Sequence, residues 1–163
     1  MVKVLVSACL VGERVRYDGA SVPGKSKIIN KWKDDGLIVP ICPEVAGNLP
    51  VPRPPAEIIK GTGTDVLINA SQVFNINGQD ITENFIKGAR EALKIVKKMK
   101  IKLAVMKDGS PSCGKTRIYD GSFSGSQRPG PGVTTALLEK NDIVVFSENE
   151  IKKAATYLKK LMY

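Results

Sequence analysis

Four short apolar runs that alternate with helix-like segments restrict the fold of this chain more than any other feature. The runs cover residues 2–7, 37–41, 103–106 and 143–146. Continuous apolar runs of this length are typical of strands that are buried on both faces of a parallel sheet. Strands that alternate with helices form such sheets through right-handed crossovers. We therefore predict an α/β fold, a Rossmann-like three-layer sandwich with a mainly parallel sheet of about four strands, in which the strands follow the order 2-1-3-4.

Apolar residues recur at helical spacing in four other segments, which cover residues 26–35, 80–99, 133–140 and 151–161. Residues 50–55 contain four prolines and cannot form regular structure, and Arg53 is expected to anchor them. Residues 65–76 are predicted to form a small hairpin-like excursion. Neither a repeat nor a linker is visible, so residues 1–163 are predicted to form a single domain.

The net charge of +9 and the lysine clusters raise the question of a nucleic-acid partner. No aromatic residues are interleaved with these lysines, as single-strand binders require, so solvated helix faces are the favoured interpretation. No apolar run approaches the ~20 residues that a membrane span needs. Residues 1–7 form a predicted strand, too short for a signal peptide, so we expect a cytoplasmic protein without a membrane partner.

The chain has no histidine and three cysteines, Cys9, Cys42 and Cys113. Without an imidazole, acid–base chemistry must use Glu, Asp, Lys, Tyr or Cys side chains. An odd number of cysteines in a protein expected in the cytoplasm argues against a disulfide framework.

All three cysteines follow predicted strands of the sheet. Cys9 lies two residues after the first strand, Cys42 ends the second, and Cys113 lies in the long irregular segment 107–125 after the third. In open parallel sheets, ligands bind outside the carboxyl ends of the strands, and long loops at that edge are usually functional. The strand order therefore predicts that three thiols converge at one edge.

Four interpretations of these thiols remain open at this point. They are buried small side chains, ligands of a zinc ion, a nucleophile with Glu44 or Lys107 as its base, or ligands of an iron–sulfur cluster. Zinc usually takes four ligands, often in close CxxC pairs, and neither a pair nor a histidine is present. A cluster of four irons held by three thiolates would leave one iron without a protein ligand, open to a substrate.

Eight motifs spread over most of the chain resemble the thiouracil desulfidase (TudS-like) family. They are SACLVG at 7–12, RYDG at 16–19, CPEVAG at 42–47, PRPPAEI at 52–58, SPSCG at 110–114, IYDGSFSG at 118–125, GVTTALL at 132–138 and VFSE at 145–148. Together these motifs are specific.

The resemblance implies a [4Fe-4S] cluster held by Cys9, Cys42 and Cys113, with an open iron that binds the substrate sulfur. It implies non-redox removal of sulfur from thiouracil-type bases, with release of hydrosulfide. The family's acid–base glutamate follows the second cysteine by two residues and corresponds to Glu44. Its active-site serine precedes the third cysteine by three and corresponds to Ser110.

Two positions depart from the family pattern, and three more residues have weaker claims. Val15 stands where many members carry a further cysteine, and Asn48 where a second glycine is usual. Three residues are candidates for contacting the substrate or supporting those that do, and these are Asp18, Lys107 and Ser112. For Asp18 a turn-forming role is favoured, since Asp before Gly is a common turn signal.

The expected partner is a small thionated nucleobase or nucleoside, with a tRNA substrate less favoured. Two other classes of function remain as alternatives. One is a sulfur carrier or donor that uses the same cluster, and the other is a basic RNA-binding module.

Overall fold

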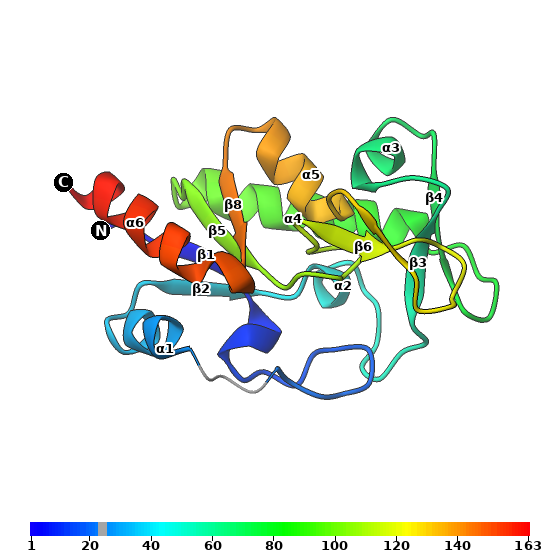
Figure 1. The fold of residues 1–163 in the computed structure, drawn as a ribbon, viewed down its shortest axis with the longest axis horizontal. Helices are drawn as coiled ribbons and strands as arrows, with labels where there is room; N and C mark the ends of the chain where they lie inside the picture. The colour runs from blue at the N-terminus through cyan, green and yellow to red at the C-terminus, as the bar shows by residue number, and fades with distance from the viewer. Residues whose placement is uncertain (23–25) are drawn as a thin grey trace.

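The computed structural model describes residues 1–22 and 26–163 and contains a four-stranded parallel sheet at its centre (Figure 1). The strands are β1 (Val4–Ser7), β2 (Ile38–Ile41), β5 (Leu103–Met106) and β8 (Val144–Ser147). Their order is β2-β1-β5-β8, and each neighbouring pair is parallel. The predicted fold class and the predicted strand order are therefore confirmed.

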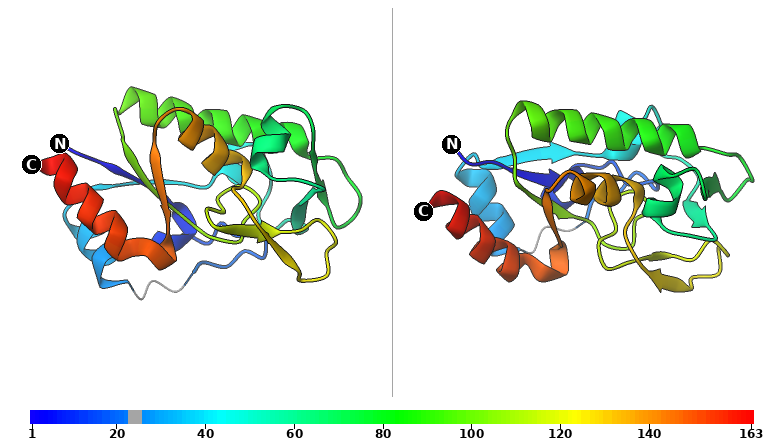
Figure 2. Two further views of the ribbon diagram at one scale, coloured as in Figure 1. Left: turned by 45° about the horizontal axis from the view of Figure 1, so that its top comes forward. Right: turned by 90° about the horizontal axis from the view of Figure 1, so that it is seen from above.

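Helices cover both faces of this sheet, which gives three layers (Figure 2). The covering helices are α1 (Lys27–Asp34) and α6 (Ile151–Met162) on one face, and α4 (Thr82–Lys98) and α5 (Val133–Lys140) on the other. Alternation along β1 divides the core, because Val4 and Val6 pack with α1 and α6 whereas Leu5 packs with α4 and α5. No helix within residues 1–22 and 26–163 is long and apolar enough to cross a membrane.

Smaller elements gather at the end of the molecule opposite the two termini (Figure 1). They are α2 (Pro43–Ala46), β3 (Ala56–Ile59), α3 (Gly63–Leu67), β4 (Gln72–Asn75), β6 (Arg117–Tyr119) and β7 (Gln127–Pro129). Two short 3-10 helices, Ala8–Val11 and Glu148–Glu150, follow β1 and β8 directly.

Two sequence-based expectations for this end of the molecule were wrong. Residues 65–76 do not form a hairpin, since they contain the end of α3 and then β4, which pairs with β3 in antiparallel fashion. The segment 107–125 is not wholly irregular, because it contains β6, which pairs with β7. The partner strand of β4 is β3, which precedes residues 65–76, and the partner strand of β6 is β7, which follows residues 107–125.

Helix α2 is held against α4 by an unusually close approach of the two backbones. A Cβ added at Gly88 of α4 would lie 1.9 Å from the carbonyl oxygen of Pro43. The side-chain amide of Asn84 donates to the carbonyl of Gly47 at 2.8 Å. Since α2 begins directly after Cys42, this contact fixes the position of the second cysteine and of Glu44.

Candidate functional site

A pocket of about 350 Å³ lies at the carboxyl edge of the sheet, and all three cysteines line it. Cys9 comes from the 3-10 helix after β1, Cys42 directly precedes α2, and Cys113 comes from the loop after β5. None is in a disulfide; Cys9 and Cys113 are buried, and Cys42 is half-buried. The structure thus brings together the three thiols that the strand order predicts to converge.

The surroundings of these thiols favour their protonated form. Burial, with a contribution from the neighbouring Cys42, raises the pKa of Cys9 to about 11. Burial also raises the pKa of Cys42 and of Cys113. A cysteine nucleophile and a cysteine ligand both act as the thiolate, so either role requires that these thiols lose their protons.

The spacing of the potential ligands argues against a single metal ion. Within residues 1–22 and 26–163, no three His, Cys, Asp or Glu side chains are grouped closely enough to hold one ion. The interpretation as a zinc site therefore has no support in the geometry of the pocket.

Glu44 lies beside the cysteines, in the first turn of α2, and pairs with Arg53. The Nε atom of Arg53 donates to Oε1 of Glu44 at 3.1 Å, and the two side chains are 4% and 15% exposed. Burial raises the pKa of Glu44, and the charge and hydrogen bond of Arg53 oppose that shift. A raised pKa brings a carboxyl closer to the working pH, which suits a group that takes up and releases a proton.

Arg53 holds several parts of the pocket wall together. Its Nη1 donates to the carbonyl oxygen of Pro50 at 3.1 Å, which is the anchoring of the proline-rich segment expected from the sequence. Its Nη2 donates to the carbonyl oxygen of Val15 at 2.9 Å and lies 4.0 Å from Sγ of Cys42. One guanidinium thus joins the segment before the RYDG motif, the proline-rich segment and α2.

Ser110 lies at the pocket, at the start of the turn that carries Cys113. Its Oγ accepts the backbone N–H groups of Ser112 at 3.1 Å and of Cys113 at 3.0 Å. The hydroxyl oxygen is therefore held by two donors, which leaves its own proton to be donated to another group.

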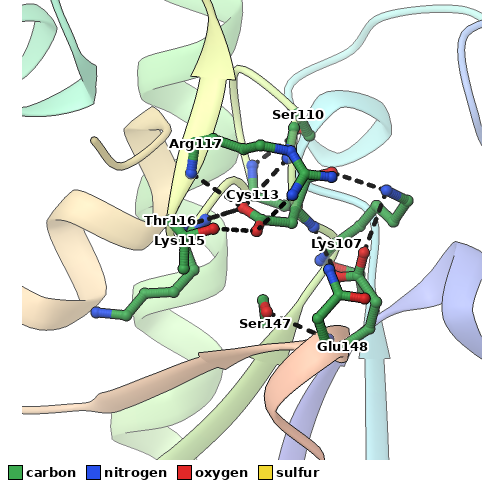
Figure 3. Close-up of polar contacts among 12 residues, drawn as sticks. Lys107, Ser110, Cys113, Lys115, Thr116, Arg117, Ser147 and Glu148 are labelled. Atoms are coloured by element: carbon green, nitrogen blue, oxygen red, sulfur yellow. Dashed lines mark hydrogen bonds and ion pairs between the residues drawn. The ribbon is translucent and has the colours of Figure 1, made fainter. Parts of the chain in front are cut away.

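The loop that carries Ser110 and Cys113 folds around the buried carboxylate of Asp108. Oδ1 of Asp108 accepts the backbone N–H groups of Lys115 and Thr116, both at 3.0 Å, and the Thr116 hydroxyl donates to Oδ2 (Figure 3). Burial alone would raise the pKa of Asp108, but these hydrogen bonds outweigh it and hold the pKa below its usual value.

Lys107 lines the pocket at the end of β5 and pairs with Glu148. Its Nζ lies 3.2 Å from Oε1 of Glu148 and donates to the carbonyl oxygen of Asp108 at 2.8 Å (Figure 3). Oε2 of Glu148 accepts the backbone N–H of Asp108 at 2.8 Å. Glu148 follows β8, so this pair connects the ends of two neighbouring strands beside the pocket.

Two of the candidate residues lie outside the pocket lining. Asp18 is exposed, and its carboxylate accepts the backbone N–H of Ala20 at 2.9 Å, as in a turn. Ser112 is buried, and its Oγ lies 3.0 Å from Oγ1 of Thr134 in α5. Neither side chain is placed to contact a molecule in the pocket.

Sequence reasoning missed the site roles of Arg53, Glu57, Asp108 and Glu148, although each lies in or next to a motif. Glu57 lines the pocket from β3, and its bonds, like those of Asp108 and Glu148, go to residues far along the chain or to backbone groups. The sequence offered one signal for these roles, a charged residue among apolar residues or prolines. A charged side chain buried in such a setting needs a partner.

The departure at Asn48 has a structural explanation. Its φ angle is 72°, in the left-handed region. Glycine adopts this conformation freely, and asparagine is one of the few other residues that tolerate it. Asn48 can therefore occupy this left-handed position after α2 at a lower cost than most other side chains.

Comparison with known proteins gives consistent results. Residues 4–150 match the model of the family described as 2-thiouracil desulfurase. An uncharacterized protein, YbbK, of Bacillus subtilis (strain 168) is 43% identical over 148 residues, which are 91% of this chain and 97% of that protein. A solved structure described as a [4Fe-4S]-dependent thiouracil desulfidase, TudS, is 42% identical with a TM-score of 0.89, covering 98% of this chain and 99% of that one.

Proposed function

Because the chain belongs to the 2-thiouracil desulfurase family, we propose that it removes the sulfur of thiouracil-type bases by means of a [4Fe-4S] cluster held by Cys9, Cys42 and Cys113. The observation that carries this proposal is the convergence of three thiols on one pocket that also contains Glu44 and Ser110. The proposed substrate is a free thionated base or nucleoside.

The donor set of the pocket fits such a cluster. Cysteine thiolates are its usual ligands, and each binds a different iron, so they stand farther apart than the ligands of one ion. The three thiols share one pocket, as the ligands of such a cluster must. When bound, the cluster supplies an iron without a cysteine ligand, which acts as a Lewis acid toward the soft sulfur of a thiocarbonyl.

In this proposal Glu44 takes a proton from the attacking water. Arg53 fixes Oε1, and the hydrogen bonds and ion pairs found among the described residues leave Oε2 free to meet water at the pocket. The raised pKa of Glu44 suits a group that accepts a proton in one step and returns it in another. Arg53 keeps the carboxylate oriented between these steps.

Ser110 is the proposed hydrogen-bond donor to the substrate. The N–H groups of Ser112 and Cys113 occupy its oxygen, so its proton is directed to a partner in the pocket. The ammonium group of Lys107, paired with Glu148, lies at the same wall. The reaction replaces C=S by C=O, the oxygen comes from water, and the sulfur leaves as hydrosulfide with a proton, so no electrons are exchanged.

The direct test is a turnover measurement on protein loaded with iron and sulfide without oxygen. Loaded protein is expected to convert many equivalents of 2-thiouracil into uracil and sulfide, with neither a reductant nor an acceptor protein. Iron-free protein serves as the control. Release of at most one sulfide per chain would indicate a sulfur carrier, and binding of RNA without any release of sulfide would indicate a binding module; either result would contradict the proposal.

A further inference from the structure

Glu57 is a buried carboxylate at the pocket for which the proposed reaction has no use. It lies in β3, is 8% exposed, and lines the pocket. Its Oε1 accepts the backbone N–H of Gly121 at 2.9 Å and that of Phe123 at 3.1 Å. One oxygen thus binds two amides of the loop that connects β6 to β7.

Phe123 has an unfavourable backbone conformation in this loop. Its φ angle is 55°, in the left-handed region that a bulky side chain rarely adopts. Gly121 and Gly125, on either side, have φ angles of 93° and 83°. Strained residues of this kind persist where the surrounding structure holds them, and they cluster at functional sites.

The loop is seated closely on the strand that carries Glu57. A Cβ added at Gly121 would lie 2.5 Å from the carbonyl oxygen of Ile58. Gly121 lies close to the backbone of β3, and Glu57 accepts hydrogen bonds from the backbone N–H groups of Gly121 and Phe123. These contacts fix the loop on both sides of Ser122. The backbone of Phe123 is therefore set by contacts with β3 and not by its own preference.

Phe123 belongs to the wall of the pocket. Phe123 is half-buried and lines the pocket together with Tyr119. Within the described part of the chain it belongs to none of the three apolar cores and forms no aromatic pair. The strained conformation is therefore not explained by packing of Phe123 in an apolar core. It places Phe123 at the wall of the pocket that also contains Glu44 and Ser110.

We propose that Phe123 contacts the face of the pyrimidine ring of the substrate and that Glu57 is the positioning residue that holds Phe123 there. This inference rests on the proposed function. Pyrimidines are flat and stack on aromatic side chains, and a phenyl face recognises the ring independently of the substituent that reacts. Phe123 therefore contributes binding that is equal for the substrate and for the transition state.

Variants of Phe123 separate the ring from the backbone. Phe123→Gly and Phe123→Asn remove the ring but tolerate the left-handed conformation, whereas Phe123→Tyr keeps the ring. In loaded protein, the first two are expected to raise KM for 2-thiouracil about tenfold with kcat nearly unchanged, and the third to leave KM close to the wild-type value. Because Phe123→Gly relieves the strain, its melting temperature is expected to equal or exceed that of the wild type.

Variants of Glu57 test the anchoring without any cluster. In Glu57→Ala, the amides of Gly121 and Phe123 are expected to exchange hydrogen at least about tenfold faster, since both lose their acceptor. Glu57→Gln retains a carbonyl oxygen at this place and is expected to restore protection. Glu91 is a partly exposed glutamate of α4 outside the pocket, so Glu91→Ala is the matched control, and hydrogen exchange in the loop of this variant should equal that of the wild type.

The outcomes distinguish this inference from the proposed function. Active wild-type protein with unchanged KM in Phe123→Gly and Phe123→Asn would overturn the contact with the pyrimidine. Unchanged exchange of the two amides in Glu57→Ala would overturn the anchoring. A loaded wild type that releases no sulfide would contradict the proposed function, whereas the exchange measurement decides on the anchoring by itself.

Discussion

Replacing Glu44 by glutamine tests its proton transfer separately from its structural role, because only one oxygen of the side chain is exchanged for nitrogen. In Glu44→Gln, the side-chain carbonyl can still accept the hydrogen bond from Nε of Arg53. The amide cannot take up a proton, so we expect turnover to fall at least about 100-fold while iron content and visible absorption stay unchanged. The measurement is the rate of sulfide release per loaded cluster, and undiminished release would remove Glu44 from its proposed role.

Arg53 is a second residue whose replacement should have a large effect, because its guanidinium is itself buried. In Arg53→Lys, a single ammonium group cannot reach Glu44 and the carbonyl oxygens of Pro50 and Val15 together. We expect the free energy of unfolding to fall by about 2–4 kcal/mol, as measured by urea denaturation.

The control for Arg53→Lys is an ion pair at the surface. Asp35→Ala breaks the exposed pair between Lys31 and Asp35, and the change in unfolding free energy should stay within about 0.5 kcal/mol. If Arg53→Lys were as mild as this control, the guanidinium would not be what holds the pocket wall together.

At the scale of elements, the loop from Asp108 to Arg117 depends on a buried carboxylate, and this dependence gives the protein an acid-sensitive part. The lowered pKa means that ionised Asp108 stabilises the fold at pH values above its unfolded pKa of about 4. This contribution is lost as the pH falls through the lower, folded pKa. We expect Asp108→Asn to reduce the free energy of unfolding by about 1–3 kcal/mol at pH 7.

The same variant shows whether the carboxylate charge is responsible. The difference in unfolding free energy between wild type and Asp108→Asn is expected to shrink as the pH is lowered from 7 to below the unfolded pKa of about 4, since the unfolded wild-type chain then takes up a proton that the folded protein does not bind. Chemical denaturation at several pH values measures this difference. A difference that stays constant over the range would show that the shape of the side chain matters and its ionisation does not.

The contact between α2 and α4 gives a prediction in which packing opposes helix propensity. Alanine favours a helix over glycine by about 1 kcal/mol, but a Cβ at position 88 would collide with the backbone of Pro43. We expect Gly88→Ala to be destabilising by about 1–3 kcal/mol and to reduce turnover, because α2 must move and it carries Glu44.

Lys87→Ala serves as the control for Gly88→Ala. Lys87 is exposed in the same helix, so its replacement should change the melting temperature little. A Gly88→Ala protein that is more stable than the wild type and fully active would show that the two backbones can separate without affecting the site.

For the whole molecule, the sequence was sufficient to predict how the cysteines meet. Apolar runs mark β1, β2, β5 and β8, and the rule of right-handed crossovers leaves few orders for them. The residues around the cysteines were harder to assign, because their partners are set by tertiary contacts. Glu57, for example, accepts hydrogen bonds from backbone amides that lie 64 and 66 positions later in the chain, and no local sequence pattern predicts these contacts.

The spread of the three proposed cluster ligands over the sheet has a consequence for global stability. Cys9, Cys42 and Cys113 follow three neighbouring strands, so a bound cluster connects segments that are distant in the chain. We expect loading with iron to raise the melting temperature of the wild type by about 5 °C or more.

Serine variants of the three cysteines test this connection one ligand at a time. Each single Cys→Ser variant is expected to bind much less iron and to lose the thermal shift, while its iron-free form melts close to the iron-free wild type. Iron analysis and thermal denaturation of the same samples give both quantities. A variant that kept its full iron content would remove that cysteine from the ligand set.

Val15 contributes to the site through its main chain, since Arg53 binds the carbonyl oxygen of Val15 and not its side chain. Every amino acid supplies this carbonyl, so selection can vary the side chain at position 15 without dismantling the arginine contact. Val15 also lines the pocket, and its side chain packs against the apolar core beneath α1 and α6. A saturation library at position 15 would therefore vary the wall of the cavity and its packing on the core while the hydrogen bond from Arg53 is kept.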